Sequence, residues 1–199
     1  MTEPEGSEPA QDLSDQDIFA VLDSDHRALL ELADRAATTG GADELAVHCE
    51  QLVMLAVRHF VAEEQYLFPL MRQHLPDGDR SVHRLSDAHR HLESELRRLE
   101  DVERSPQAVG PILADVRARL VDHVESLSQA FASLRGEIDP AEAQRLGDDV
   151  LGVEQLAPTR PRLDHSDSPA LNKLVSLVEG YVDRIRDAYT HRGVERDER

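Results

Sequence analysis

Four stretches of the chain carry apolar residues at alternating spacings of three and four, and each stretch has a histidine within its apolar series. This spacing places the apolar side chains on one face of an α-helix, and such a helix is stable only when that face is buried. The stretches cover residues 14–38, 42–74, 80–103 and 107–135, with short turns between them. They predict an all-α fold, an up-down-up-down four-helix bundle.

The second stretch contains the segment HFVAEEQYLFP at residues 59–69. His59 and Glu63 are four residues apart, so they share one face of the helix, and the rest of that face is apolar. A buried carboxylate is costly unless a proton, a cation or a metal neutralises it. The segment alone leaves two interpretations open: a pair of metal ligands, or a Glu63 side chain at the stripe edge that reaches water. Pro69 should bend the helix one turn after Glu63.

The chain also contains an internal repeat. The segment DHRAL at residues 25–29 resembles the segment AHRHL at residues 88–92. Each half of the chain supplies two histidines in apolar stripes, 33 residues apart in the first half and 34 in the second: His26, His59, His89 and His123. A bundle built from a duplicated helical hairpin brings all four toward one level of its core. Imidazole and carboxylate ligands without thiolate suit iron, manganese or zinc.

Composition narrows the functional classes. The formal net charge is -18, from 22 basic and 40 acidic residues. This charge disfavours binding to nucleic acid and to anionic membrane surfaces. Cys49 is the only cysteine, so the chain has neither an intrachain disulfide nor a cysteine-based zinc site. Because neither a signal peptide nor a span near transmembrane length is recognisable, we expect a cytoplasmic protein.

The order of these motifs resembles the hemerythrin-like family, whose unit is the HHE cation-binding domain. The resemblance covers roughly residues 15–135, and its most specific part is the segment at 59–69. It implies a four-helix bundle around a non-haem di-iron centre, in which histidines bind terminally and two carboxylates bridge the metals. For this chain it implies iron, as one or two ions, with these ligands: His26, His59, Glu63, His89 and His123.

The fourth stretch departs from the family pattern. The resemblance implies an acid four or five residues after His123, where this chain has Leu127 and Ser128. Glu93, four residues after His89, is either a partial replacement ligand or a solvated surface residue. We therefore expect an asymmetric site, in which the ion near the first two helices is the tighter one.

Two functional hypotheses follow. The first is a non-haem iron-binding protein that binds or senses a small ligand, such as dioxygen, nitric oxide or peroxide, or that handles iron. The alternative is a helical interaction module with a degenerate, metal-free site. An enzyme in the strict sense is left open but is less favoured, because one bridging acid is missing.

The bundle accounts for only part of the chain. We expect residues 1–12 to be a disordered acidic segment and residues 13–136 to form the hemerythrin-like bundle. Residues 137–199 should contain a short helix, a proline-containing linker and a C-terminal amphipathic helix. This last helix, from Pro169 to about Thr190, has an apolar face that should dock on the bundle or join two copies in a homo-oligomer.

Overall fold

The structure is a computed structural model that describes residues 16–101 and 105–155. The predicted acidic segment, the linker and the C-terminal amphipathic helix lie outside these residues. The described residues contain helices and turns and no strand, which confirms the all-α prediction. In chain order the elements are α1 (Ile18–Thr38), α2 (Ala42–Ala62), the π-helical turn η2 (Glu63–Leu67), α3 (Phe68–His74), α4 (Gly78–Asp101), α5 (Pro106–Glu137) and α6 (Pro140–Gln155).

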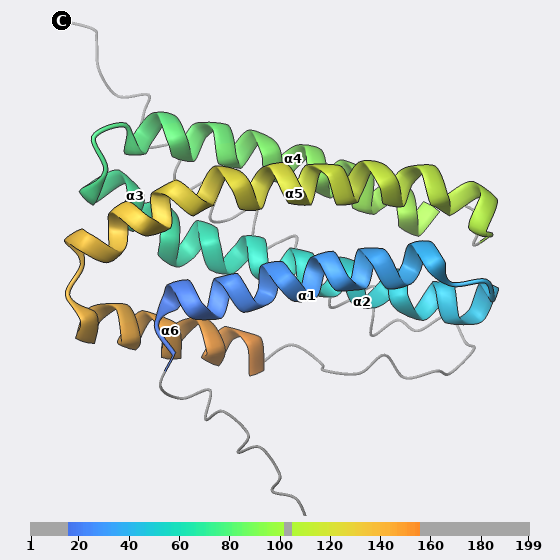
Figure 1. Ribbon diagram of the computed structural model, residues 1–199, viewed down its shortest axis with the longest axis horizontal. Helices are drawn as coiled ribbons and strands as arrows, with labels where there is room; N and C mark the ends of the chain where they lie inside the picture. Colours follow the sequence, from blue (N-terminus) through green and yellow to red (C-terminus); the bar gives the residue numbers. More distant parts are fainter. Residues whose placement is uncertain (1–15, 102–104, 156–199) are drawn as a thin grey trace, which may run out of the picture.

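The long helices form a bundle in which successive members run in opposite directions (Figure 1). Helix α1 packs against α2 and α5, and α4 packs against α2, α3 and α5. Helix α6, the short helix expected after the bundle, lies outside it against α1 and α2. Helices α1, α2, α4 and α5 therefore enclose a common interior.

Two helix starts follow from local sequence. Helix α1 begins after Asp17, whose carboxylate accepts a hydrogen bond from the backbone N–H of Ala20 at 2.7 Å. Helix α5 begins after Ser105, whose hydroxyl accepts from the N–H of Ala108 at 3.4 Å. Pro106 occupies the first turn of α5, where a missing N–H costs no helical hydrogen bond.

The interior contains two apolar clusters at different levels of the bundle. Large buried members of the first are Phe19, Leu22, Leu67, Phe131 and Leu134. Large buried members of the second are Leu29, Leu52, Phe60, Leu92 and Leu120. On α1, α4 and α5 the histidine of the apolar stripe falls between residues of the first cluster and residues of the second. The polar residues of the core thus lie in a layer between two apolar clusters.

The run Ala42–His74, formed by α2, η2 and α3, is long and apolar enough to cross a membrane by length and composition, with a hydropathy of 1.3. The expectation that no span approaches this length was therefore wrong. A core helix of a bundle meets the same criterion because other helices surround it. Half of the apolar window is buried (50%), and the run carries the buried Glu63, so we interpret it as the core helix of the bundle.

Helix α6 approaches the start of α1 closely at Gly147. A Cβ atom added at this position would lie 2.1 Å from the backbone oxygen of Gln16. Such a contact is far shorter than a carbon–oxygen van der Waals distance, and the atom in the way is backbone. Glycine at position 147 therefore allows the two backbones to pack directly against each other.

Candidate metal centre

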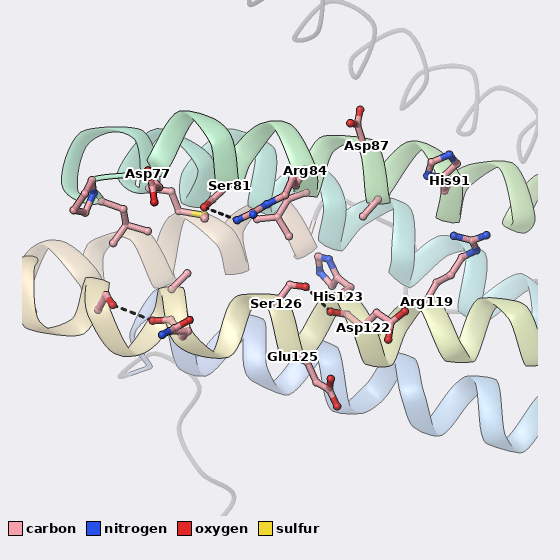
Figure 2. A pocket seen from close by; sticks show the side chains of 18 residues that line it. Asp77, Ser81, Arg84, Asp87, His91, Arg119, Asp122, His123, Glu125 and Ser126 are labelled. Carbon is pink, nitrogen blue, oxygen red and sulfur yellow. Dashed lines mark hydrogen bonds between the residues drawn. The ribbon is translucent and has the colours of Figure 1, made fainter.

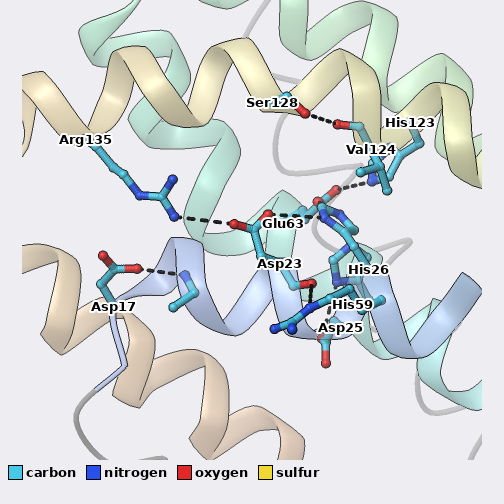
Figure 3. Close-up of polar contacts among 12 residues, drawn as sticks. Asp17, Asp23, Asp25, His26, His59, Glu63, His123, Val124, Ser128 and Arg135 are labelled. Atoms are coloured by element: carbon cyan, nitrogen blue, oxygen red, sulfur yellow. Dashed lines mark hydrogen bonds and ion pairs between the residues drawn. The ribbon is translucent and has the colours of Figure 1, made fainter. Parts of the chain in front are cut away.

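Glu63 lies in the middle of the bundle, and its side chain is fully buried. Four histidine rings surround it, one each from α1, α2, α4 and α5, and none is more than 3% exposed: His26, His59, His89 and His123. Figure 3 shows three of these rings converging on the carboxylate. The four helices of the repeat therefore meet at one side chain.

Each oxygen of the Glu63 carboxylate faces two imidazoles. Oε1 lies 3.2 Å from Nε2 of His26 and 3.1 Å from Nε2 of His59. Oε2 lies 3.0 Å from Nε2 of His89 and 3.2 Å from Nε2 of His123. The carboxylate thus divides the histidines into two pairs, and each pair comes from one half of the internal repeat.

Carboxylates also hold the far nitrogens of two histidines. Nδ1 of His59 lies 3.3 Å from Asp25 Oδ2, and Nδ1 of His89 lies 3.0 Å from Glu64 Oε1. Both acids are buried. A carboxylate in this position fixes the tautomer and orientation of a histidine and makes it a better metal ligand. The sequence pattern did not indicate either acid as functional, although each is next in sequence to an expected ligand.

The other two histidines lack such a support. Within the described residues, Nδ1 of His26 and Nδ1 of His123 have no hydrogen-bond partner, although both atoms are buried. The carboxylate of Asp23 lies 3.9 Å from Nδ1 of His26, beyond hydrogen-bonding distance. For His123 the internal repeat gives the reason, because Ala88 occupies the position that matches Asp25.

Helix α5 also lacks counterparts of the two acids in η2. By their spacing from the histidine of each helix, Leu127 matches Glu63 and Ser128 matches Glu64. Leu127 is 1% exposed and belongs to the first apolar cluster. Ser128 is exposed, and its hydroxyl donates to the carbonyl of Val124 at 3.0 Å (Figure 3). The described acids of α5 are all exposed, so this helix contributes no carboxylate to the core.

Glu93, the remaining residue that the sequence proposed as a ligand, is partly exposed on α4, one turn beyond His89. The buried core positions at this part of the helix belong to Leu92 and Leu96. Four residues form a group whose ligand atoms all lie within 4.8 Å of one another: His26, His59, Glu63 and His123. His89 joins this group through Oε2 of Glu63. The structure thus brings together five of the six proposed residues, and Glu93 is not among them.

The surrounding imidazoles keep the buried carboxylate ionised. Burial acts to raise the pKa of Glu63, but the charges and hydrogen bonds of the neighbouring histidines hold it well below its usual value. Burial acts to lower the pKa of His59, but Glu63 and Asp25 outweigh it and raise that pKa to about 9. The pKa of His89 is also raised, because hydrogen bonds to Glu63 and Glu64 outweigh burial.

His123 differs from these two histidines. Burial lowers the pKa of His123 to about 4, because the attraction of Glu63 is too small to compensate, and His89 and His59 oppose a further positive charge. In neutral solution the metal-free cluster therefore contains an ionised Glu63, a protonated His59 and a neutral His123.

The backbone hydrogen bonding changes at the site itself. In η2 the N–H of Phe68 donates to the carbonyl of Glu63, five residues earlier. Pro69 has no N–H and cannot continue the α-helical pattern. The sequence predicted a bend one turn after Glu63. In the structure the change from α-helical to π-helical hydrogen bonding begins at Glu63 itself. In this wider turn both Glu63 and the next residue, Glu64, are buried, and π-turns are frequent at functional sites.

A groove of about 840 Å³ opens between α4 and α5 (Figure 2). Its lining includes Ala88 from α4 and His123 from α5. Charged residues of both signs line it as well: Asp77, Arg84, Asp87, Arg119, Asp122 and Glu125. His123, one histidine of the second repeat, therefore lies beside an opening to the surface.

These features define a class: a helical bundle whose core holds a buried histidine–carboxylate cluster compatible with a metal site. Residues 17–131 match the family model described as the hemerythrin HHE cation binding domain. The match covers more than half of the chain, so this chain belongs to the hemerythrin HHE family. No curated protein and no solved structure matches the chain significantly.

Proposed function

We propose that this chain is a hemerythrin-like non-haem iron-binding protein. In this proposal it binds or senses a small ligand, such as dioxygen, nitric oxide or peroxide, or handles iron. It acts in the cytoplasm, without a nucleic-acid or membrane partner. The observation that carries the proposal is the buried carboxylate of Glu63, whose two oxygens each face a pair of histidines.

The donor geometry supports a metal better than it supports hydrogen bonds alone. Nε2 of His59 and Nε2 of His123 lie 3.1 and 3.2 Å from Glu63 but lack hydrogen-bond partners within the described residues. Buried polar atoms are costly without partners, and a metal ion between nitrogen and oxygen would satisfy both. Imidazole and carboxylate donors are those that iron, manganese and zinc accept.

The residues divide into two matching sets. His26 and His59 with Oε1 of Glu63 would hold one ion, and His89 and His123 with Oε2 would hold the other. When bound, iron supplies open coordination positions and redox chemistry for a small ligand. Because both sets have two imidazoles and one carboxylate oxygen, the asymmetry expected from sequence would have to come from the surroundings of the ligands.

The alternative is a helical interaction module whose metal site is degenerate. The observation in its favour is the loss of carboxylates in the second repeat. The positions that match Asp25, Glu63 and Glu64 hold these residues: Ala88, Leu127 and Ser128. Seven buried polar residues of the described core would then remain there without a metal. This arrangement would lower the stability of the bundle and gain nothing for an interaction surface.

Metal analysis separates the two functions. The protein is purified from iron-supplemented cells, and the iron content and the absorption spectrum are measured before and after addition of nitric oxide or peroxide. We expect one to two iron ions per chain and a spectrum that changes when the small ligand is added. A protein that stays metal-free after iron loading would leave the interaction module as the function.

A further inference from the structure

The two halves of the internal repeat differ at a position that borders the groove. In the first half, Asp25 lies 3.3 Å from Nδ1 of His59. In the second half, Ala88 holds the matching position, and Nδ1 of His123 has no hydrogen-bond partner within the described residues. The fold therefore supports one of these histidines with a carboxylate and leaves its counterpart without one.

The groove reaches the place where this carboxylate is missing. Ala88 and His123 both line it, although His123 is only 2% exposed. Figure 2 shows His123 between α4 and α5, at the inner side of the groove and close to Ser126 and Asp122. The volume of the groove, about 840 Å³, is ample for a small organic molecule.

We infer that the groove between α4 and α5 binds a small carboxylate, whose oxygen accepts the Nδ1–H of His123 in place of the side chain that Ala88 lacks. This inference rests on the proposed function. A neutral imidazole has one donor and one acceptor nitrogen, so a metal on Nε2 leaves the proton on Nδ1. His123 then has a buried N–H beside a groove in which residue 88 offers no acceptor side chain.

The structure itself indicates the class of ligand. The two histidines with support on Nδ1 both have it from a carboxylate, Asp25 for His59 and Glu64 for His89. A charged acceptor makes a shorter and stronger hydrogen bond than water or an amide does. The acids in the groove outnumber its arginines and oppose an anion, so the ligand should be small and its affinity modest.

Metal and carboxylate binding should therefore be linked. A carboxylate on the far nitrogen of a metal-bound histidine typically raises metal affinity ten- to 100-fold, by the order of magnitude known for such partners. Because linkage is reciprocal, a small carboxylate should tighten metal binding, and metal should tighten carboxylate binding.

Zinc and sodium acetate are suitable probes, since zinc has no redox chemistry. The zinc dissociation constant is measured by chelator competition in acetate, in sodium chloride of equal ionic strength and in acetamide. We expect acetate alone to tighten zinc binding, by severalfold and up to about tenfold. A downfield imidazole N–H proton signal of the zinc-loaded protein should respond to acetate as well.

Variants at position 88 test whether the effect of acetate on zinc binding arises in the groove. Ala88→Asp supplies the carboxylate internally, so it should bind zinc more tightly without acetate and should no longer respond to it. Ala88→Leu fills the space without a charge and should also lose the response. Ser133→Leu, which changes another residue of the same groove, should respond as the wild type does.

The outcomes distinguish the inference from the proposed function. If zinc binds but acetate acts no differently from chloride, or if the response persists in Ala88→Asp, the groove is not a carboxylate site, and the proposed function is unaffected. If the wild type binds neither zinc nor iron, both are overturned.

Discussion

At the scale of single residues, Glu63 is the side chain that joins the four histidines of the site. Its two oxygens contact four histidines from four helices, and no described acid of α5 shares this task. Its side chain is fully buried, and the neighbouring imidazoles stabilise its charge. The loss of this one charge should therefore affect both histidine pairs together.

Glu63→Gln tests this role, because it keeps the shape of the side chain and removes its charge. We expect metal affinity to fall by at least 100-fold, since an amide is a poor bridge between cations. Glu125→Gln, an exposed change on α5, is the matched control and should keep the metal content of the wild type. Equal iron content in Glu63→Gln and wild type would show that the carboxylate is not a ligand.

The stability of the metal-free protein should depend on pH, and His123 and His59 should act on opposite sides of neutral pH. The pKa of His123 is lowered to about 4, so this neutral histidine contributes stability above pH 6.5 that is lost as pH falls toward 4. The pKa of His59 is raised to about 9, so its contribution is complete below pH 6.5 and is lost as pH rises through 9.

Urea unfolding of the metal-free protein across this pH range measures both effects. His123→Gln should flatten the acid side of the stability profile, and His59→Gln should flatten the alkaline side. A profile in which neither substitution changes the slope would contradict the charge assignment.

At the scale of elements, helix α5 repeats α2 in its apolar spacing and its histidine but not in its acids. Leu127 is buried in the core at the position that matches Glu63. The same face of the helix is therefore turned inward in α5 as in α2, but it lacks a carboxylate ligand at this position. The space that a second carboxylate would need is occupied by an apolar side chain of the first cluster.

Leu127→Glu should restore a second core carboxylate. In the metal-free protein it should lower the free energy of unfolding by about 3 kcal/mol or more, because it buries a second acid. After iron loading it should bring the metal content to two ions per chain and strengthen near-ultraviolet absorption. Leu127→Gln is the control for size. If wild type already holds two ions and Leu127→Glu changes nothing, the acid of α5 is dispensable.

The contact of α6 with the start of α1 depends on a single glycine. Gly147→Ala would place a Cβ atom 2.1 Å from the backbone oxygen of Gln16, so the two elements would have to separate. We expect a loss of about 1–3 kcal/mol in the free energy of unfolding, measured by urea denaturation. Gly152→Ala, in the same helix with no atom near its added Cβ, should be neutral or slightly stabilising. Equal stability of the two variants would show that α6 does not pack as described.

At the scale of the whole molecule, the polar layer connects α1, α2, α4 and α5 between two apolar clusters. A ligand that binds all four helices stabilises only the folded chain. Metal should therefore raise the melting temperature of the entire bundle rather than loosen or tighten one segment.

Calorimetry with and without metal tests this coupling. At free metal 100 times above its dissociation constant, the gain should be about 2.7 kcal/mol, in one cooperative transition. Glu63→Gln should show no such gain. An increase in the melting temperature that is equal in Glu63→Gln would indicate that metal binds elsewhere.

The sequence determined the helices, the histidine on each and the missing acid of α5, because the spacing of apolar residues along a helix is a local property. The family and the all-α fold also followed from it. Only the packing of the helices decided which atoms meet. The contacts of Asp25 with His59 and of Glu64 with His89 join different helices, so they depend on how those helices are rotated and aligned against each other. The same packing leaves Glu93 outside the cluster, since leucines take the core positions beside it.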